Sequence, residues 1–131
     1  MKTLFFLFFF CLTSVVYAQT DIKIEEAKDH IGDSVHIVSK IYGVKYFADA
    51  KEPVTLINIG AAYPNQLLTA VVRKDVRGKM LTEPTQENLV GKEVHLRGKV
   101  ELFKGKPQIM ITDPSQFQLV GDKGEVLPFK N

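Results

Sequence analysis

Cysteine and tryptophan are nearly missing from this sequence. It has no tryptophan, and its one cysteine, Cys11, lies in an apolar segment near the amino terminus. From Gln19 to Asn131 there is no cysteine, so disulfide bonds are excluded there and the fold must depend on its hydrophobic core. A segment of this length suffices for one domain and not for two.

Residues that would support catalysis are also scarce. After Ala18 the only serines are Ser34, Ser39 and Ser115, and none lies in a Gly-x-Ser-x-Gly motif. The carboxylates are scattered, and the adjacent Glu25 and Glu26 are typical of a solvated helix face. No glycine-rich phosphate loop precedes a predicted helix. We therefore expect a protein that is not an enzyme, with no catalytic residue and no cofactor.

The chain has no large excess of one charge, since its formal net charge is +2. Basic residues gather in one region, residues 73–112, where nine basic and five acidic residues give a net charge of +4. A strongly basic protein would point to nucleic acid or an anionic membrane. This distribution predicts a local basic face at most.

The segment from Met1 to Ala18 has the features of a secretory signal peptide. Lys2 precedes an unbroken apolar run from Leu4 to Leu12, and small residues end the segment at Ala18. A transmembrane anchor is the alternative, but the 15 residues from Leu4 to Ala18 are fewer than the ~20 that span a bilayer. We expect cleavage before Gln19, a periplasmic or secreted protein, and no stable membrane anchor after cleavage.

Alternation of apolar and polar residues predicts a first strand over Val35–Ile41, with Gly43 as a bulge or bend. Further strands are predicted over residues 54–59, 67–73, 93–103 and 107–112. Residues 45–53 are predicted as a loop and residues 74–80 as a charged connection. Residues 117–120 are predicted as a short apolar extension. A short helix is predicted over residues 24–30 and ends at Gly32. A second short helix is predicted to begin at an N-cap of Thr82 or Thr85, to run to about Val90 and to end at Gly91. Residues 19–23 are predicted as a lead and residues 121–131 as a frayed tail.

Two segments resemble each other: Gly, Val, His and Lys recur at equivalent positions of residues 31–41 and residues 90–100. One interpretation is a duplicated binding element. The favoured one is that both segments solve the same local problem, which is a helical turn, a glycine stop and a strand with one buried face.

Five strands with a helix between the third and the fourth predict an all-β domain with one or two short helices, a five-stranded Greek-key OB-fold barrel over residues 24–120. The sequence resembles small bacterial OB-fold proteins of the nucleic-acid-binding type. The resemblance rests on Leu56–Gly60, Tyr63–Gln66, Gly91–Val94, Gly98–Val100, Lys104–Ile109 and Asp113–Gln116. Such modules occur alone behind signal peptides or attached to secreted nucleases. The resemblance implies an exported binding module for single-stranded DNA or RNA or a similar anionic polymer, although OB barrels also bind sugars, metabolites and proteins.

OB folds contact ligands on their second and third strands and on the loops joining strands 1–2 and 4–5. Both loops of this chain mix lysines with aromatic residues. A lysine can neutralise a phosphate while an aromatic ring stacks on a base, which is worth roughly 1–3 kcal/mol per base. The predicted ligand-binding residues are Lys45, Tyr46, Phe47, Asn58, Arg73, Phe103, Lys104 and Lys106. Alternatively, Phe47 and Phe103 close the barrel ends, and the Lys-Gly-Lys turn is ordinary hairpin chemistry.

A protein–protein interaction or accessory role in the envelope, without nucleic-acid binding, is the alternative function. The segment 73–79 would then contact an acidic partner, unless it is a solvated loop. Histidine spacing does not predict a metal site, because no His-x-x-x-His motif occurs. His36 and His95 both lie early in strands expected to pair antiparallel, so we expect them at opposite ends of that ladder and exposed.

Overall fold

The computed structural model of the chain describes residues 19–126. The predicted signal peptide, residues 1–18, and the C-terminal segment 127–131 lie outside the described part. The strands are β1 (Thr20–Asp21), β2 (Ser34–Phe47), β3 (Val54–Ile59), β4 (Leu68–Arg73), β5 (Glu93–Phe103), β6 (Lys106–Ile111) and β7 (Phe117–Val120). The helices are the 3₁₀ helices η1 (Ile24–Asp29) and η2 (Pro114–Gln116) and the short α-helices α1 (Lys74–Arg77) and α2 (Gln86–Leu89).

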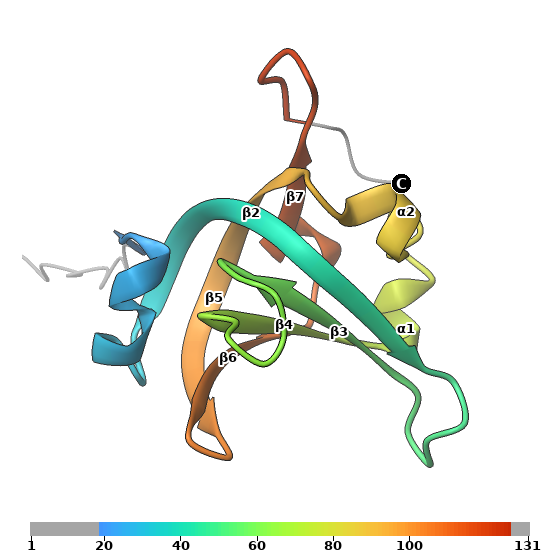
Figure 1. The fold of residues 1–131 in the computed structure, drawn as a ribbon, viewed down its shortest axis with the longest axis horizontal. Helices are drawn as coiled ribbons and strands as arrows, with labels where there is room; N and C mark the ends of the chain where they lie inside the picture. The colour runs from blue at the N-terminus through green and yellow to red at the C-terminus, as the bar shows by residue number, and fades with distance from the viewer. Residues whose placement is uncertain (1–18, 127–131) are drawn as a thin grey trace, which may run out of the picture.

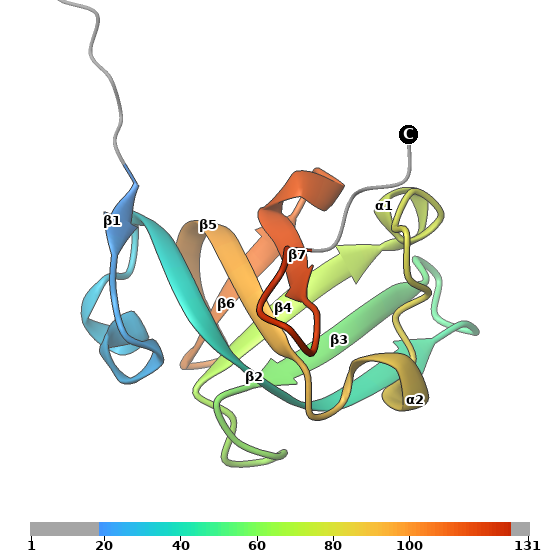
Figure 2. The ribbon, with the colours of Figure 1, turned by 90° about the horizontal axis from the view of Figure 1, so that it is seen from above.

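Five of the strands close into a ring. Going round it, β2 pairs with β3, β3 with β4, β4 with β6, β6 with β5, and β5 again with β2. Every pair is antiparallel except β4 with β6, which is parallel. β1 pairs with the edge of β2 that does not face β5, and β7 pairs with the edge of β5 that does not face β2. In Figures 1 and 2, β2 arches over the ring, with η1 at one end and α1 and α2 at the other.

The ring closes because β2 and β5 each bend and change partner. The first half of β2 pairs with β5, and its second half pairs with β3 after a bulge between Ile41 and Gly43. β5 leaves β2 after Lys99 and continues with β6. Gly98 has a φ of +150°, and a Cβ there would lie 2.7 Å from Ile109 Cγ2, so only glycine fits without displacing its neighbour. The predicted bulge at Gly43 is confirmed.

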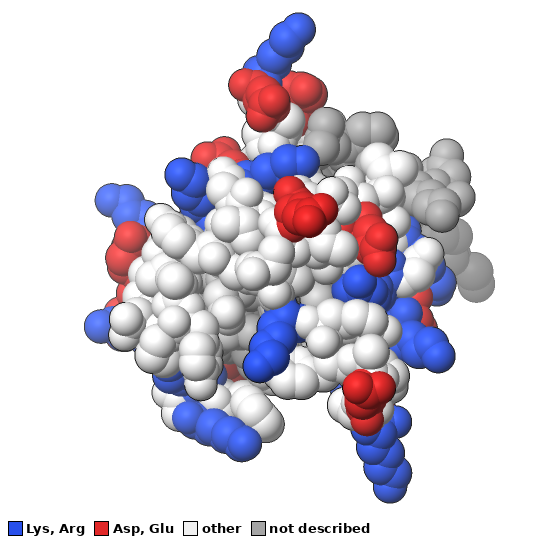
Figure 3. All heavy atoms as spheres, turned by 45° about the vertical axis from the view of Figure 1, so that its right-hand side comes forward, with Lys and Arg blue, Asp and Glu red and all other residues white. Residues whose placement is uncertain are grey.

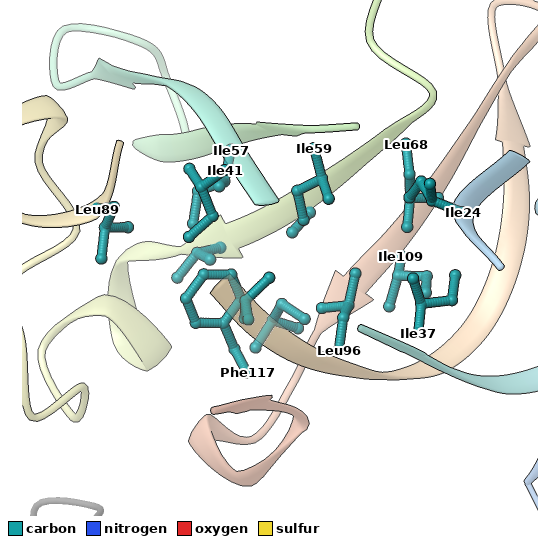
Figure 4. Packing of buried hydrophobic residues seen from close by; sticks show 14 of the residues in the cluster. Ile24, Ile37, Ile41, Ile57, Ile59, Leu68, Leu89, Leu96, Ile109 and Phe117 are labelled. Carbon is teal, nitrogen blue, oxygen red and sulfur yellow. The ribbon is translucent and has the colours of Figure 1, made fainter. Parts of the chain in front are cut away.

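The core fills the ring with the inward side chains of its five strands. Ile57 and Ile59 of β3 point inward, together with Ile37 and Ile41 of β2 (Figure 4). η1 closes one end of the core with Ile24, and α2 closes the other with Leu89 (Figure 4). The alternation of buried and outward residues along each strand therefore fixes which side chains form the outer surface.

Most predicted elements are found within one or two positions of their expected bounds, and five points differ. Residues 20–21, in the predicted lead, form β1, and residues 114–116 form η2, where no helix was expected. Lys45, Tyr46 and Phe47 were expected in a loop, yet they end β2, because they pair with the first residues of β3 and extend the hairpin. Residues 74–77 form α1 where only a charged connection was expected. In the segment expected as a frayed tail, Val126 bridges back to Val120, so the chain forms a turn there.

Candidate ligand-binding face

The predicted site residues gather mainly on one outer surface of the ring. It is made by the second half of β2, by β3, β4 and β6, and by the end of β5, and we call it the outer face. Strand register arranges its outward side chains in rows. The rows are Phe47, Val54 and Arg73; then Lys45, Leu56, Val71 and Met110; then Asn58, Thr69, Gln108 and Glu101; and last Phe103 with Lys106.

The first end of the outer face carries an aromatic ring beside cations. Phe47 is 36% exposed, and Lys45 Nζ lies 4.9 Å from the centroid of its ring, within cation–π distance. Arg73 is exposed two strands away in the same row. Beside it lies an open hollow of about 850 Å³ with an apolar floor and a rim of both charges. Its lining is Lys51, Glu52, Pro53, Val54, Val71, Arg73, Lys74, Asp75 and Met110.

The opposite end repeats this combination. Phe103 is 56% exposed, and Lys104 Nζ lies 5.4 Å from the centroid of its ring. Lys106 donates a hydrogen bond to the backbone oxygen of Pro64. Lys106 is therefore partly engaged by the loop between β3 and β4, and the same loop presents Tyr63, which is 74% exposed. Neither Phe47 nor Phe103 is a buried plug of the ring.

Seven of the eight predicted residues lie on or beside the outer face, and Tyr46 does not. Lys104 sits at the edge of the face, in the turn after β5, with a φ of 49°. Tyr46 has the opposite parity to Lys45 and Phe47 in β2, so its side chain turns away from this surface. Its ring packs 3.9 Å from the guanidinium carbon of Arg77. Tyr63 was not predicted as a site residue, although an aromatic residue in an expected turn was the available signal.

Comparison of the chain with protein-family models, with curated proteins and with solved structures finds no match.

Between its two aromatic ends, the outer face carries polar and apolar side chains together with one exposed carboxylate, Glu101, in the row of Gln108. Asn58 is half-buried between Gly43 and Thr69, in one row with Gln108. From the row of Arg73 to the row of Lys106 is about six residues along β6, or about 20 Å at ~3.3 Å per residue. Figure 3 shows one side of the molecule, where Lys and Arg are scattered among Asp and Glu around a broad uncharged area. Ligand contact on the outer face therefore depends on stacking and hydrogen bonding as much as on charge, because its rows hold few charged side chains.

In the basic segment 73–79, Arg77 is built into the fold, whereas Arg73, Lys74 and Lys79 are exposed. Arg77 donates to the buried Thr55 hydroxyl at 2.7 Å and to the Pro84 oxygen at 3.2 Å, and it pairs with Glu83 at 3.3 Å. Of the two predicted interpretations, a partner contact or a solvated loop, neither describes this arginine. It fastens α1 to β3 and to the loop before α2.

His36 and His95 are adjacent, which corrects the expectation that they lie at opposite ends of their ladder. His36 Nε2 lies 3.0 Å from His95 Nδ1, and Asp21 Oδ1 lies 2.7 Å from His36 Nδ1. Only residues 34–40 of β2 pair with residues 93–99 of β5, so both histidines lie one position from the centre of the ladder. Burial, together with the nearby His36 and Arg97, lowers the pKa of His95 below its usual value.

Among residues 19–126, neither a membrane-spanning helix nor a three-ligand metal site is found. No helix in this range has the length and apolar character needed to cross a membrane. No three side chains among its His, Cys, Asp and Glu residues converge as a metal-ligand set.

Proposed function

We propose that the ring is an OB-fold barrel and that its outer face binds single-stranded nucleic acid or a similar anionic polymer. The strand order supports the fold assignment: the ring runs first, second, third, fifth and fourth strand, with α2 between the third and the fourth. The outer face includes the second and third ring strands, β3 and β4, which are the ligand-contacting strands of OB folds.

The observation that carries the proposal is the pair of exposed rings, Phe47 and Phe103, each with a lysine against it, on one continuous face. An aromatic ring stacks on any base, and the lysine beside it can reach the phosphate that follows. Asn58 and Gln108 lie between the rings and can hydrogen-bond to base edges or sugars. The rows of the two rings lie about 20 Å apart along the strands, and the rings also lie on β2 and β5, which are four strand spacings of about 4.8 Å apart across the outer face. A nucleic-acid strand crossing from one ring to the other suits the range of ~4–16 nucleotides bound by one OB fold.

The experiment is a titration of a fluorescent oligothymidine with the protein, followed by anisotropy at about 50 mM and about 200 mM salt. Each stacking ring is worth roughly 1–3 kcal/mol, so Phe47→Ala and Phe103→Ala should each weaken binding roughly 5- to 150-fold. Val38→Ala, an exposed apolar residue on the β2–β5 side of the ring, is the matched control and should leave affinity unchanged.

Two results would refute the proposal in different ways. Absence of binding at the lower salt would exclude nucleic acid as the ligand, because phosphate contacts are strongest there. Binding that neither phenylalanine substitution weakens would place the interaction elsewhere on the molecule.

The hollow beside Arg73 favours a second candidate function, which is binding of a protein partner in the envelope. Its apolar floor of Val54, Val71 and Met110 and its rim of mixed charge fit a peptide segment better than a uniformly anionic chain. Recovery of one stoichiometric partner from native envelope, insensitive to nuclease and lost in a Met110→Glu variant, would support this function. Both functions assume that the protein is exported. The test of export is the amino terminus of the protein recovered from the periplasm, which should be Gln19.

A further inference from the structure

The two similar sequence segments form a local two-fold arrangement in the fold. Segments 31–41 and 90–100 run antiparallel, and at the centre of their ladder Ile37 faces Leu96, which is its counterpart in the other segment. Backbone hydrogen bonds obey the same symmetry. Gly32 N donates to Val100 O at 2.7 Å, and the counterpart Gly91 N donates to Ile41 O at 2.9 Å.

This symmetry brings the recurring histidines together. His36 faces Arg97 and His95 faces Val38, so each histidine lies one residue from the symmetry centre, on the outward side of the sheet. They are diagonal neighbours, a spacing that long side chains bridge. Their ring centroids are 5.1 Å apart with planes 29° from parallel, and His36 Nε2 lies 3.0 Å from His95 Nδ1.

Asp21 makes the pair asymmetric and fixes the tautomer of His36. β1 pairs with the start of β2 and sets Asp21 opposite His36, with Oδ1 2.7 Å from His36 Nδ1. A carboxylate only accepts hydrogen bonds, so His36 Nδ1 carries the proton. In the neutral ring, Nε2 then presents its lone pair toward His95. That lone pair accepts a hydrogen bond from His95 Nδ1 at 3.0 Å, so a metal ion bound by both nitrogens would take the place of this proton, which would move to His95 Nε2. A carboxylate behind the other ring nitrogen is the arrangement that orients histidines bound to metals.

We propose that His36 Nε2 and His95 Nδ1 together bind a divalent copper or nickel ion, with Asp21 as the positioning residue behind His36. Imidazole nitrogens bind such ions at about 2.0–2.1 Å, so two nitrogens in neighbouring square positions lie about 2.9 Å apart, against about 3.4 Å in a tetrahedral site. The observed 3.0 Å is the length of the hydrogen bond between the two nitrogens, and it is also within about 0.1 Å of the separation that the square arrangement needs, so copper could replace the shared proton with little movement of the rings. Copper(II) and nickel(II) prefer that geometry, and copper binds most tightly of the divalent series.

The surroundings leave room for the remaining ligands to be water. The side chain of His36 is 19% exposed, and His95 is half-buried, so the ion is reached from solvent. Arg97 lies opposite His36 in the ladder and its positive charge opposes cation binding, although its Nη1 donates to Gln118 Oε1 at 2.9 Å on the side of β7. The site joins β1, β2 and β5 and shares no residue with the outer face, so it stands or falls independently of the proposed nucleic-acid function.

The test is a titration of the full chain with Cu²⁺ and, separately, Ni²⁺, followed by calorimetry and by electron paramagnetic resonance of the copper form. We expect one equivalent bound with two nitrogen ligands in the copper spectrum. His36→Gln and His95→Gln should each weaken binding by more than about tenfold, and Asp21→Asn by about 10- to 100-fold. The matched control is His30→Gln: His30 Nδ1 pairs with Asp33 Oδ2 at 3.1 Å, with no second imidazole against it among the described residues, so this substitution should change nothing.

Equal binding by wild type and His95→Gln, or an equal loss in His30→Gln, would overturn the proposal. Thermal unfolding supplies a readout that holds even if a variant folds poorly. His36 and His95 are far apart in the chain and meet only when it is folded, so copper should raise the melting temperature of wild type and His30→Gln. A wild-type copper spectrum with fewer than two nitrogen ligands, or no rise in melting temperature, would also refute the site.

Discussion

Arg77 holds one end of the ring together, and its removal tests how the short helix α1 is anchored. The arginine lies at the end of α1, and its guanidinium donates to Thr55 Oγ1 at 2.7 Å. The same group lies 3.9 Å from the ring centroid of Tyr46 and pairs with Glu83 at 3.3 Å. Thr55 is fully buried, so its hydroxyl has no access to water in the folded protein. We predict that Arg77→Ala lowers the free energy of unfolding substantially.

Three contributions set the size of the loss. Leaving the buried Thr55 hydroxyl without its partner costs about 1–3 kcal/mol. The cation–π contact with Tyr46, which is half in solvent, contributes about 0.5–1 kcal/mol. Glu83 is 70% exposed, so its ion pair adds little, on the order of a few tenths of a kcal/mol. The expected total is about 2–4 kcal/mol, a large part of the ~5–15 kcal/mol that stabilises a domain.

The assay is equilibrium urea unfolding of four proteins: wild type, Arg77→Ala, Thr55→Val and the double variant. Valine removes the hydroxyl and keeps the shape, so Arg77→Ala should cost about 1–2 kcal/mol less in the Thr55→Val background than in the wild type. Lys74→Ala, an exposed cation on the same helix, is the control and should stay within about 0.5 kcal/mol of wild type. A loss below about 0.5 kcal/mol for Arg77→Ala, or strictly additive substitutions, would refute the reasoning.

Three further predictions concern the backbone and the helix ends. Gly98→Ala should destabilise the fold by about 1–3 kcal/mol, because the new Cβ would lie 2.7 Å from Ile109 Cγ2 at a φ that disfavours alanine; unchanged urea unfolding would contradict this. Thr85→Ala should cost about 1 kcal/mol in the same assay, since the Thr85 side chain accepts the capping hydrogen bond of α2, whereas Thr85→Ser should cost little. Hydrogen bonds from the side chain and backbone of Ser115 lower the pKa of Asp113 in the folded protein. The charged carboxylate therefore stabilises the fold above the ordinary pKa of aspartate, and this stabilisation is lost as the pH falls through the pKa of Asp113 in the folded protein. Asp113→Asn should remove that part of the acid dependence of the free energy of unfolding.

Strand positions were predictable because each strand buries one face. The period-two alternation of a half-buried strand is a local property, and it located β3 and β5 at their observed bounds. The end of β2 was not predictable in the same way. Lys45 and its two neighbours carry large exposed side chains, which are typical of a loop. What keeps them in the strand is cross-strand pairing with residues 54–56, which local sequence does not encode.

The same limit explains why Tyr46 was grouped with Lys45 and Phe47, although its side chain lies on the other side of β2. Inward residues of β2 are odd-numbered up to Ile41 and even-numbered from Val44, since the bulge at Gly43 inserts one residue. A shift of one residue exchanges the two faces of a strand. The bulge was predicted, but its effect on parity follows only from the register with β3. Asn58 and Arg73 lie on strands without a bulge, and simple alternation placed both on the outer face.

The histidine pair was missed because the register between two strands far apart in the chain is a tertiary property. Early positions in two antiparallel strands lie at opposite ends only if the strands pair along their whole length. Here β2 and β5 pair through their first halves alone, and the centre of the ladder falls at Ile37 and Leu96. The similarity between segments 31–41 and 90–100 was the available signal. An antiparallel pair of identical segments has a two-fold centre, and residues near that centre meet their own counterparts.

The bends in β2 and β5 have a consequence for how surfaces are arranged on this small domain. Each strand gives its first half to the β2–β5 ladder and its second half to the sheet that carries the outer face. His36 and Phe47 therefore belong to one strand and yet to two separate surfaces, as do His95 and Phe103. A change of strand register would move every core side chain of that strand, and the close-packed core would be disturbed as a whole. A change of side chain on an outward face leaves the register intact. A substitution on one of these surfaces should therefore leave the other unchanged, provided that the backbone at the bulge before Gly43 and at Gly98 keeps both bends.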